Sequence, residues 1–157
     1  MMSVFLPCLL ERWSSPAMPG DGSRSFNTWQ DVRRDVLRNL EWLLNCEETS
    51  LLGGDSAVPV EVARSVLMYG IPAYSGKPQS AMKTDDVAWA IRERIVAFET
   101  RIEPGRLTVT AIGQNDEHTF NRMRFTIQGY LRADPVPIEF IVQSEIDLES
   151  GSARVLG

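Results

Sequence analysis

The chain has 157 residues, which suits one domain with its own hydrophobic core. Its net charge of -5 leaves no basic excess to neutralise phosphates, which argues against nucleic-acid binding as its main role. No apolar run approaches the roughly 20 residues that a membrane-spanning helix needs, and a composition of 43% hydrophobic and 24% charged residues is ordinary for a globular protein.

The N-terminus combines an apolar peptide with a tether. Residues 1–13 are apolar but lack the basic region of a signal peptide. The large apolar side chains of this peptide are Phe5, Leu6, Leu9 and Leu10. Residues 14–26 are rich in Pro, Gly and Ser and are predicted to form a flexible linker. We expect the peptide either to fold back on its own domain or to bind a partner.

The segment from about 27 to 46 is predicted to be an amphipathic helix. Its apolar stripe comprises Trp29, Val32, Val36, Leu40, Leu43 and Leu44. Asp35 is assigned to the opposite, charged face with Arg38 three residues later, a spacing that stabilises a helix by only about 0.2–0.5 kcal/mol. This charged face is interpreted either as solvated or as a docking surface.

A shorter helix is predicted from Pro59 to about Met68, because Pro suits the first helical position. Its apolar residues lie on more than one side, so we expect it to be well buried. These residues are Val60, Ala63, Val66 and Leu67. Gly70 is placed to end the helix, and Pro72 forbids its continuation.

The next helix is predicted to begin with Thr84 as its N-cap and to extend to Ile102. One face of it is apolar at helical spacing. The stripe consists of Val87, Ile91, Ile95, Phe98 and Ile102. Pro104 and Gly105 are predicted to stop this helix and to turn the chain into a strand.

Alternating apolar and polar residues then predict strands. They cover residues 107–111, 120–132, 138–148 and a last short segment, 153–156. Helices thus come first and strands cluster late. This order predicts an α+β fold, in which N-terminal helices pack on one face of a small, mainly antiparallel sheet formed by the C-terminal half. Residues 27–157 are predicted to form this single domain.

The residues that most often carry metal or nucleophilic chemistry are sparse. Cys8 and Cys46 fit no metal spacing, which favours a reduced, cytosolic protein. His118 is the only histidine and follows a polar turn, so it is expected to be a surface residue. No metal site and no cofactor site is predicted.

Four stretches, in this order, resemble a known family. They are residues 33–45 (RRDVLRNLEWLLN), 62–72 (VARSVLMYGIP), 98–102 (FETRI) and 131–137 (LRADPVP). The chain resembles TssE, the family of baseplate subunits of type VI secretion systems, which is part of the wider family of contractile-tail baseplate wedge proteins. The resemblance extends over nearly the whole chain.

The resemblance implies a non-catalytic, cytoplasmic assembly protein in the membrane-docked baseplate, without direct membrane insertion. It implies TssF and TssG as partners in the wedge, and TssB and TssC as partners in the first ring of the contractile sheath. The subunit would link the two and help to initiate sheath assembly. It also implies that sheath strands add to an edge of the sheet, for which residues 153–156 are our choice.

The family carries a Glu-Pro-Arg motif that faces partners at the end of a helix. Glu99, Thr100 and Arg101 match it, so the middle proline is missing, and Glu103-Pro104 is an alternative match. With the N-terminal apolar peptide, Glu99 and Arg101 are the candidate partner-binding residues. An exposed ion pair contributes about 0–1 kcal/mol to stability, so charge reversal at Glu99 or Arg101 is expected to change the melting temperature little. The same change is expected to block assembly with the sheath.

The family is also described as lysozyme-like, so a phage-tail-type lysozyme or peptidoglycan hydrolase is the alternative function. Such an enzyme needs two carboxylates about 5–9.5 Å apart, one of them with a raised pKa. The candidates are Glu99, Glu103, Glu139 and Glu145. None of them lies in a recognisable catalytic motif, so no enzymatic activity is expected.

Overall fold

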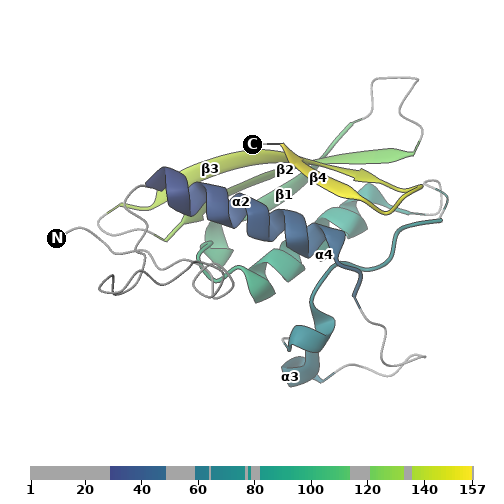
Figure 1. The fold of residues 1–157 in the computed structure, drawn as a ribbon, viewed down its shortest axis with the longest axis horizontal. Coiled ribbons are helices and arrows are strands. Elements are labelled where there is room, and N and C mark those ends of the chain that lie inside the picture. Colours follow the sequence, from purple (N-terminus) through teal and green to yellow (C-terminus); the bar gives the residue numbers. More distant parts are fainter. Residues whose placement is uncertain are drawn as a thin grey trace, which may run out of the picture.

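The computed structural model describes residues 29–48, 59–63, 65–76, 78, 82–113, 121–132 and 136–156. The helical elements are α2 (Trp29–Asn45), α3 (Val60–Ala63), the 3-10 turn η1 (Val66–Met68), α4 (Thr84–Phe98) and the 3-10 turn η3 (Pro104–Arg106). The strands are β1 (Thr108–Ile112), β2 (Arg122–Leu131), β3 (Ile138–Asp147) and β4 (Ala153–Leu156). In Figure 1 the sheet forms one layer, α2 and α4 form a second layer on one of its faces, and α3 stands apart from both. The predicted α+β class is confirmed.

Helix α2 buries the apolar stripe that its period predicts. The buried members of the stripe are Val32, Val36, Leu40, Leu43 and Leu44. The prediction is wrong at Trp29, which is 49% exposed at the start of the helix. It is also wrong at Asp35, which lies three residues after Val32 and is buried with it.

Helix α4 differs from its prediction at both ends. Lys83 is the N-cap and makes no side-chain capping hydrogen bond, so Thr84 is the first helical residue and not the cap. At the other end, Glu99 leaves the helical region with φ -110° and ψ 83°. The helix therefore ends at Phe98, well before Pro104.

The four strands form one antiparallel sheet in the order β1-β2-β3-β4. β2 and β3 pair along their whole length, from Arg122 opposite Asp147 to Leu131 opposite Ile138. β4 is therefore an edge strand, as expected for residues 153–156, and β1 is the edge on the other side.

The core lies between the sheet and the two long helices. Alternate residues of the two central strands face the helices, as period 2 predicts. Those buried in this way include Met123, Phe125, Ile127, Phe140 and Ile146. Helix α4 packs against β1 and α2 packs against β4, so one helix supports each edge of the sheet.

The segment from Val60 to Met68 is not the buried helix that the sequence predicts. It is broken into α3 and η1 by Ser65, whose backbone is extended at φ -82° and ψ 162°. Val66 is 83% exposed and Leu67 is 56% exposed, and Met68 is the buried residue of η1. The break divides the apolar residues between two short turns, so they do not form one continuous buried face.

Gly70 follows this segment, and its backbone lies against the end of α2. Its φ is +114°, and a Cβ at this position would lie 2.4 Å from the backbone oxygen of Cys46. The N–H of Ile71 donates to that same oxygen at 2.9 Å, and the N–H of Glu48 donates to the C=O of Ile71 at 2.8 Å. Only glycine allows the two backbone segments to approach so closely.

Candidate protein-binding site

The turn after α4 is held to the end of β2 by main-chain hydrogen bonds. The N–H of Arg132 donates to the C=O of Arg101 at 2.7 Å, and the N–H of Glu103 donates to the C=O of Tyr130 at 2.9 Å. Ile102, between them, is buried. This pairing converts the chain from helix to strand geometry, and it fixes the backbone from which the Arg101 side chain extends.

The guanidinium of Arg101 joins the end of α4 to α2. Its Nε donates to Glu99 Oε1 at 2.7 Å and its Nη2 donates to Glu99 Oε2 at 2.6 Å, which is a bidentate pair. Its Nη1 donates to Asp35 Oδ2 at 2.6 Å. One planar side chain thus binds a carboxylate that directly follows α4 and a carboxylate of α2.

Two residues of α2 complete this group. Arg38 Nη2 donates to Asp35 Oδ1, and Asn39 Nδ2 donates to Glu99 Oε2 at 3.4 Å. We call Asp35, Arg38, Asn39, Glu99 and Arg101 the charge network. Its two carboxylates face two guanidiniums, and both acids are buried, with Asp35 2% and Glu99 5% exposed. A buried carboxylate needs such partners, because an unpaired buried charge is very costly.

The electrostatics of the network favour a permanently charged Arg101. Burial lowers the pKa of Arg101, but hydrogen bonds and charges from Glu99 and Asp35 outweigh burial and hold this pKa above its usual value. Nearby, burial raises the pKa of Tyr69, and the charges of Cys46 and Glu99 raise it further. The Tyr69 ring packs edge-on against Phe98 with centroids 5.2 Å apart.

The sequence indicated Glu99 and Arg101 but missed Asp35, Arg38 and Asn39 as members of this network. Asp35 and Arg38 were assigned to the charged face of α2. Asp35 and Asn39 lie one helical turn apart beside the apolar stripe, and this spacing was the available signal. Because Asp35 and Glu99 are buried, we correct the expectation that charge reversal at the junction leaves the melting temperature nearly unchanged.

The role of Glu99 and Arg101 in partner binding stays a prediction. The Arg101 side chain is 22% exposed. A guanidinium has five N–H donors, and three of them serve Glu99 and Asp35, so two remain. The alternative match lies just beyond, where Glu103 pairs with Arg106 at 3.5 Å.

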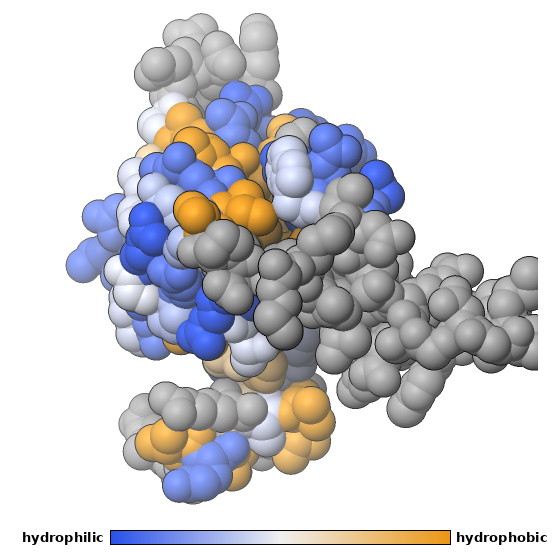
Figure 2. All heavy atoms as spheres, turned by 90° about the vertical axis from the view of Figure 1, so that its left-hand side faces the viewer, coloured by the Kyte–Doolittle hydropathy of each residue, from blue (hydrophilic) through white to orange (hydrophobic). Residues whose placement is uncertain are grey.

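A second surface is formed by exposed apolar residues of α3 and η1. Val60 is 63% exposed, and Val66 and Leu67 are also exposed. We call these three residues the α3 surface. Figure 2 shows orange side chains on the lobe at the bottom of the molecule, where Figure 1 places α3. Exposed apolar side chains that gather in this way often mark a protein-binding site.

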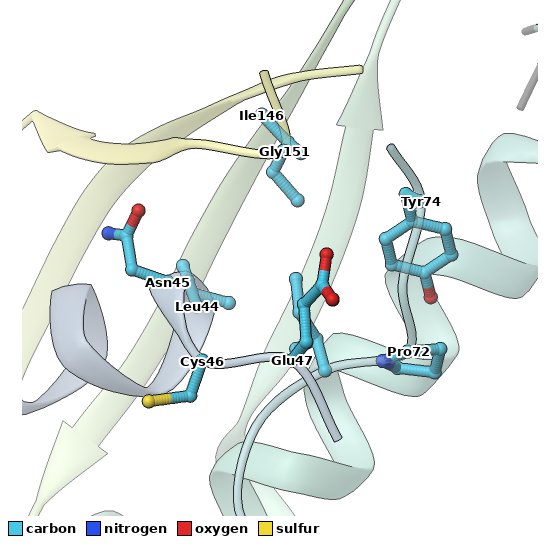
Figure 3. A pocket seen from close by; sticks show the side chains of 9 residues that line it. Leu44, Asn45, Cys46, Glu47, Pro72, Tyr74, Ile146 and Gly151 are labelled. Atoms are coloured by element: carbon cyan, nitrogen blue, oxygen red, sulfur yellow. The ribbon is translucent and has the colours of Figure 1, made fainter. Parts of the chain in front are cut away.

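A small hollow lies beside the end of α2 (Figure 3). Its lining residues are Leu44, Asn45, Cys46, Glu47, Ile71, Pro72, Tyr74, Ile146 and Gly151. It offers about 10 Å³ to water-sized molecules, which is room for one water and far less than an organic substrate needs. Burial is the main cause that raises the pKa of Tyr74 to about 12.

The carboxylates proposed for a hydrolase are bound to other side chains. Glu139 accepts hydrogen bonds from Gln128 Nε2 at 3.2 Å and Tyr130 Oη at 3.3 Å. Glu145 accepts from Arg122 Nη1 and Arg124 Nε, each at 2.9 Å. Glu139 and Glu145 lie six residues apart on one strand, a separation of roughly 20 Å, which exceeds the spacing of glycosidase acids.

Other site chemistry can be assessed only for the described part of the chain. Within it, no three His, Cys, Asp or Glu side chains group together in a way that could hold a metal ion. No helix in the described ranges is long and apolar enough to cross a membrane. His118, Cys8 and the peptide that contains Phe5 lie outside these ranges, so their predicted roles stay predictions.

Comparison with known proteins gives one family. The model of the family described as baseplate wedge protein gp25 matches residues 30–136, more than half of the chain. The matched range contains α2 except its first residue, and also α4, the whole charge network, β1 and β2. Searches of curated proteins and of solved structures gave no match.

Proposed function

Because the chain belongs to the baseplate wedge protein gp25 family, whose members are structural components of a baseplate, we propose that it is the TssE subunit of a type VI secretion system. In this role it links the baseplate wedge to the first ring of the contractile sheath and helps to initiate sheath assembly. Its partners are TssF and TssG in the wedge and TssB and TssC in the sheath. It acts in the cytoplasm, in the membrane-docked baseplate, and it is not an enzyme.

The observation that carries this proposal is a small antiparallel sheet with two edge strands on a rigid support. An edge strand presents backbone N–H and C=O groups, with which an extended segment of another protein can pair. Helices α2 and α4 support the two edges, and Arg101 joins these helices. A linker that receives strands from a sheath subunit needs this combination of open edge and fixed position.

A linker also needs surfaces for its wedge partners. The apolar peptide of residues 1–13 supports this part of the proposal, because burying one of its large side chains contributes about 1.5–3 kcal/mol before the loss of chain entropy. The α3 surface and the exposed side of Arg101 are further candidates. The α3 surface stands apart from the sheet in Figure 1, so a wedge partner bound there would leave the sheet edges accessible.

Co-purification tests the wedge assignment. The tagged full-length chain is expected to form a stable complex with TssF and TssG from the same genome. Deleting residues 1–13 is expected to leave the domain folded but to weaken this complex. A full-length variant in which Phe5, Leu6, Leu9 and Leu10 are replaced by Ser keeps the chain length and tests the apolar contact itself. No complex at low and at moderate salt contradicts the proposal.

The alternative function, a phage-tail-type lysozyme or peptidoglycan hydrolase, is tested with a cell-wall suspension. A structural subunit leaves the turbidity unchanged at any protein concentration. Clearing by the purified chain contradicts the structural proposal. If clearing occurs, Glu145→Gln and Glu139→Gln show whether a carboxylate of β3 is responsible.

A further inference from the structure

The backbone of β4 alternates between its partner strand and the open edge. The N–H of Asp147 donates to the C=O of Ser152 at 2.9 Å, so this pair is hydrogen-bonded. In an antiparallel ladder hydrogen-bonded pairs recur at every second residue, and the register pairs Ile146 with Ala153. The N–H and C=O groups of Ala153, and two residues later those of Val155, therefore point away from β3.

Asn45 occupies the outward groups of Ala153. The N–H of Ala153 donates to Asn45 Oδ1 at 2.9 Å, and Asn45 Nδ2 donates to the C=O of Ala153 at 2.8 Å. The same Nδ2 donates to the C=O of Glu41 at 2.8 Å, which anchors the amide to α2. Figure 3 shows this side chain extending from the end of α2 toward the yellow strands. The amide makes the two hydrogen bonds that a neighbouring strand would make.

The other edge strand, β1, follows the same alternation. The N–H of Arg132 donates to the C=O of Arg101, so even-numbered residues near the end of β2 face the β1 side. The register pairs even-numbered residues of β1 with even-numbered residues of β2. The even-numbered residues of β1 thus bond to β2, and the backbone groups of Val109 and Ala111 point to the open edge.

Side chains of the described residues close the beginning of this edge. Arg92 Nε donates to the C=O of Leu107 at 3.2 Å, and its Nη2 donates to the C=O of Pro104 at 3.0 Å. Beyond that point, the outward groups of Val109 and Ala111 bond to no other described residue. The β1 sequence TVTAI has no charge, Pro or Gly, although such residues usually protect edge strands. Its Thr, Val and Ile favour strand pairing.

We propose that Asn45 closes the β4 edge and that an extended segment of a partner protein pairs with Val109 and Ala111 of β1. This inference rests on the proposed function, in which a sheath subunit supplies the segment. β1 offers the N–H and C=O of two residues, whereas β4 offers those of Val155 alone among its described residues. Pairing along β4 must also displace Asn45. The choice of residues 153–156 as the accepting edge is revised accordingly.

Two matched proline substitutions test the proposal. Ala111→Pro removes an outward N–H of β1 and places a ring in the path of an added strand, while the bonds from β1 to β2 remain. Val155→Pro makes the same change on β4. Full-length variants are assayed for binding to the TssB–TssC complex, with TssF–TssG binding and melting temperature measured alongside. Ala111→Pro is expected to weaken TssB–TssC binding about tenfold or more, and Val155→Pro by less than about twofold.

Three outcomes contradict the inference. Loss of TssB–TssC binding by Val155→Pro but not by Ala111→Pro places the strand at β4 and overturns the inference. Unchanged binding by both variants overturns it as well, while the link to the sheath stands. A wild-type chain that binds TssF–TssG but not TssB–TssC refutes the sheath link itself, and the inference falls with it.

Hydrogen exchange on the wild-type chain provides a test that does not depend on the fold of a variant. Adding TssB–TssC is expected to slow exchange of the Val109 and Ala111 amides and to leave Val155 unchanged; the reverse pattern overturns the proposal. Asn45→Ala is expected to speed exchange of the Ala153 amide at least about tenfold without added partner. An unchanged rate at Ala153 shows that Asn45 does not close the edge.

Discussion

Replacing Arg101 by alanine tests the charge network most directly. The change removes three side-chain hydrogen bonds of 2.6–2.7 Å and leaves the buried carboxylates of Glu99 and Asp35 without this partner. Removing one side of a buried ion pair costs about 3–5 kcal/mol. We expect Arg101→Ala to lower the free energy of unfolding by about 3 kcal/mol, the low end of this range. Asp35 keeps its hydrogen bond from Arg38, Glu99 keeps its hydrogen bond from Asn39, and the Arg101 side chain is partly exposed.

Unfolding followed by circular dichroism measures this loss. For a domain of this size, 1 kcal/mol corresponds to about 2–4 °C, so the melting temperature of Arg101→Ala is expected to fall by about 10 °C. Arg34→Ala is the control on α2, because Arg34 is 78% exposed and lies 3.6 Å from Asp31. An exposed pair of this kind contributes at most about 0.5 kcal/mol. Arg101→Lys keeps the positive charge but lacks the planar guanidinium that binds a carboxylate with two N–H groups, so it should give an intermediate loss of stability.

Equal stability of Arg101→Ala and Arg34→Ala refutes the argument from burial. It would mean that Glu99 and Asp35 find solvent or other donors when Arg101 is absent, and it would restore the original expectation of a surface pair. Measuring TssF–TssG binding of Arg101→Lys below its melting temperature separates the two roles of Arg101. Weak binding by the folded variant would favour contact with a partner.

Three further predictions concern single positions. Gly70→Ala is expected to lower the free energy of unfolding by about 3 kcal/mol, measured by urea titration, because of its positive φ and the contact of its Cβ with the Cys46 oxygen. Leu67→Asp is expected to leave the melting temperature unchanged but to weaken TssF–TssG binding, and a large loss of stability would mean that Leu67 is buried. Tyr74→Phe is expected to remove a phenol titration near pH 12. Because the folded-state pKa of Tyr74 is raised, the stability that this phenol contributes is present below pH 10 and is lost as the pH rises toward 12.

Local periodicity predicted most of the elements. The alternation of Met123, Phe125 and Ile127 places one face of β2 in the core, and all three side chains are buried as expected. The stripe of α2 likewise predicts its buried side, apart from Trp29. These predictions succeed because the side-chain direction repeats every 2 or 3.6 residues along the chain, whatever the element packs against.

Local rules failed where distant backbone controls the chain. The stop of α4 was assigned to Pro104, but the helix ends at Phe98 because residues 101–103 pair with β2. The apolar residues from Val60 to Leu67 predict a buried helix, yet Val60, Val66 and Leu67 are exposed in the described fold. Hydrophobic residues indicate a need for burial, but they do not indicate whether the partner lies in the same chain.

The sequence by itself determined the class of fold, the family resemblance and two members of the charge network, Glu99 and Arg101. The tertiary structure decided what these residues bind, because Asp35 lies 66 residues from Arg101 and reaches it only when α2 packs beside the end of α4. It likewise decided what binds the outer side of β4, since Asn45 meets Ala153 across 108 residues. Hydrogen bonds between such distant residues depend on how the helix layer sits under the sheet, and no local repeat encodes that arrangement.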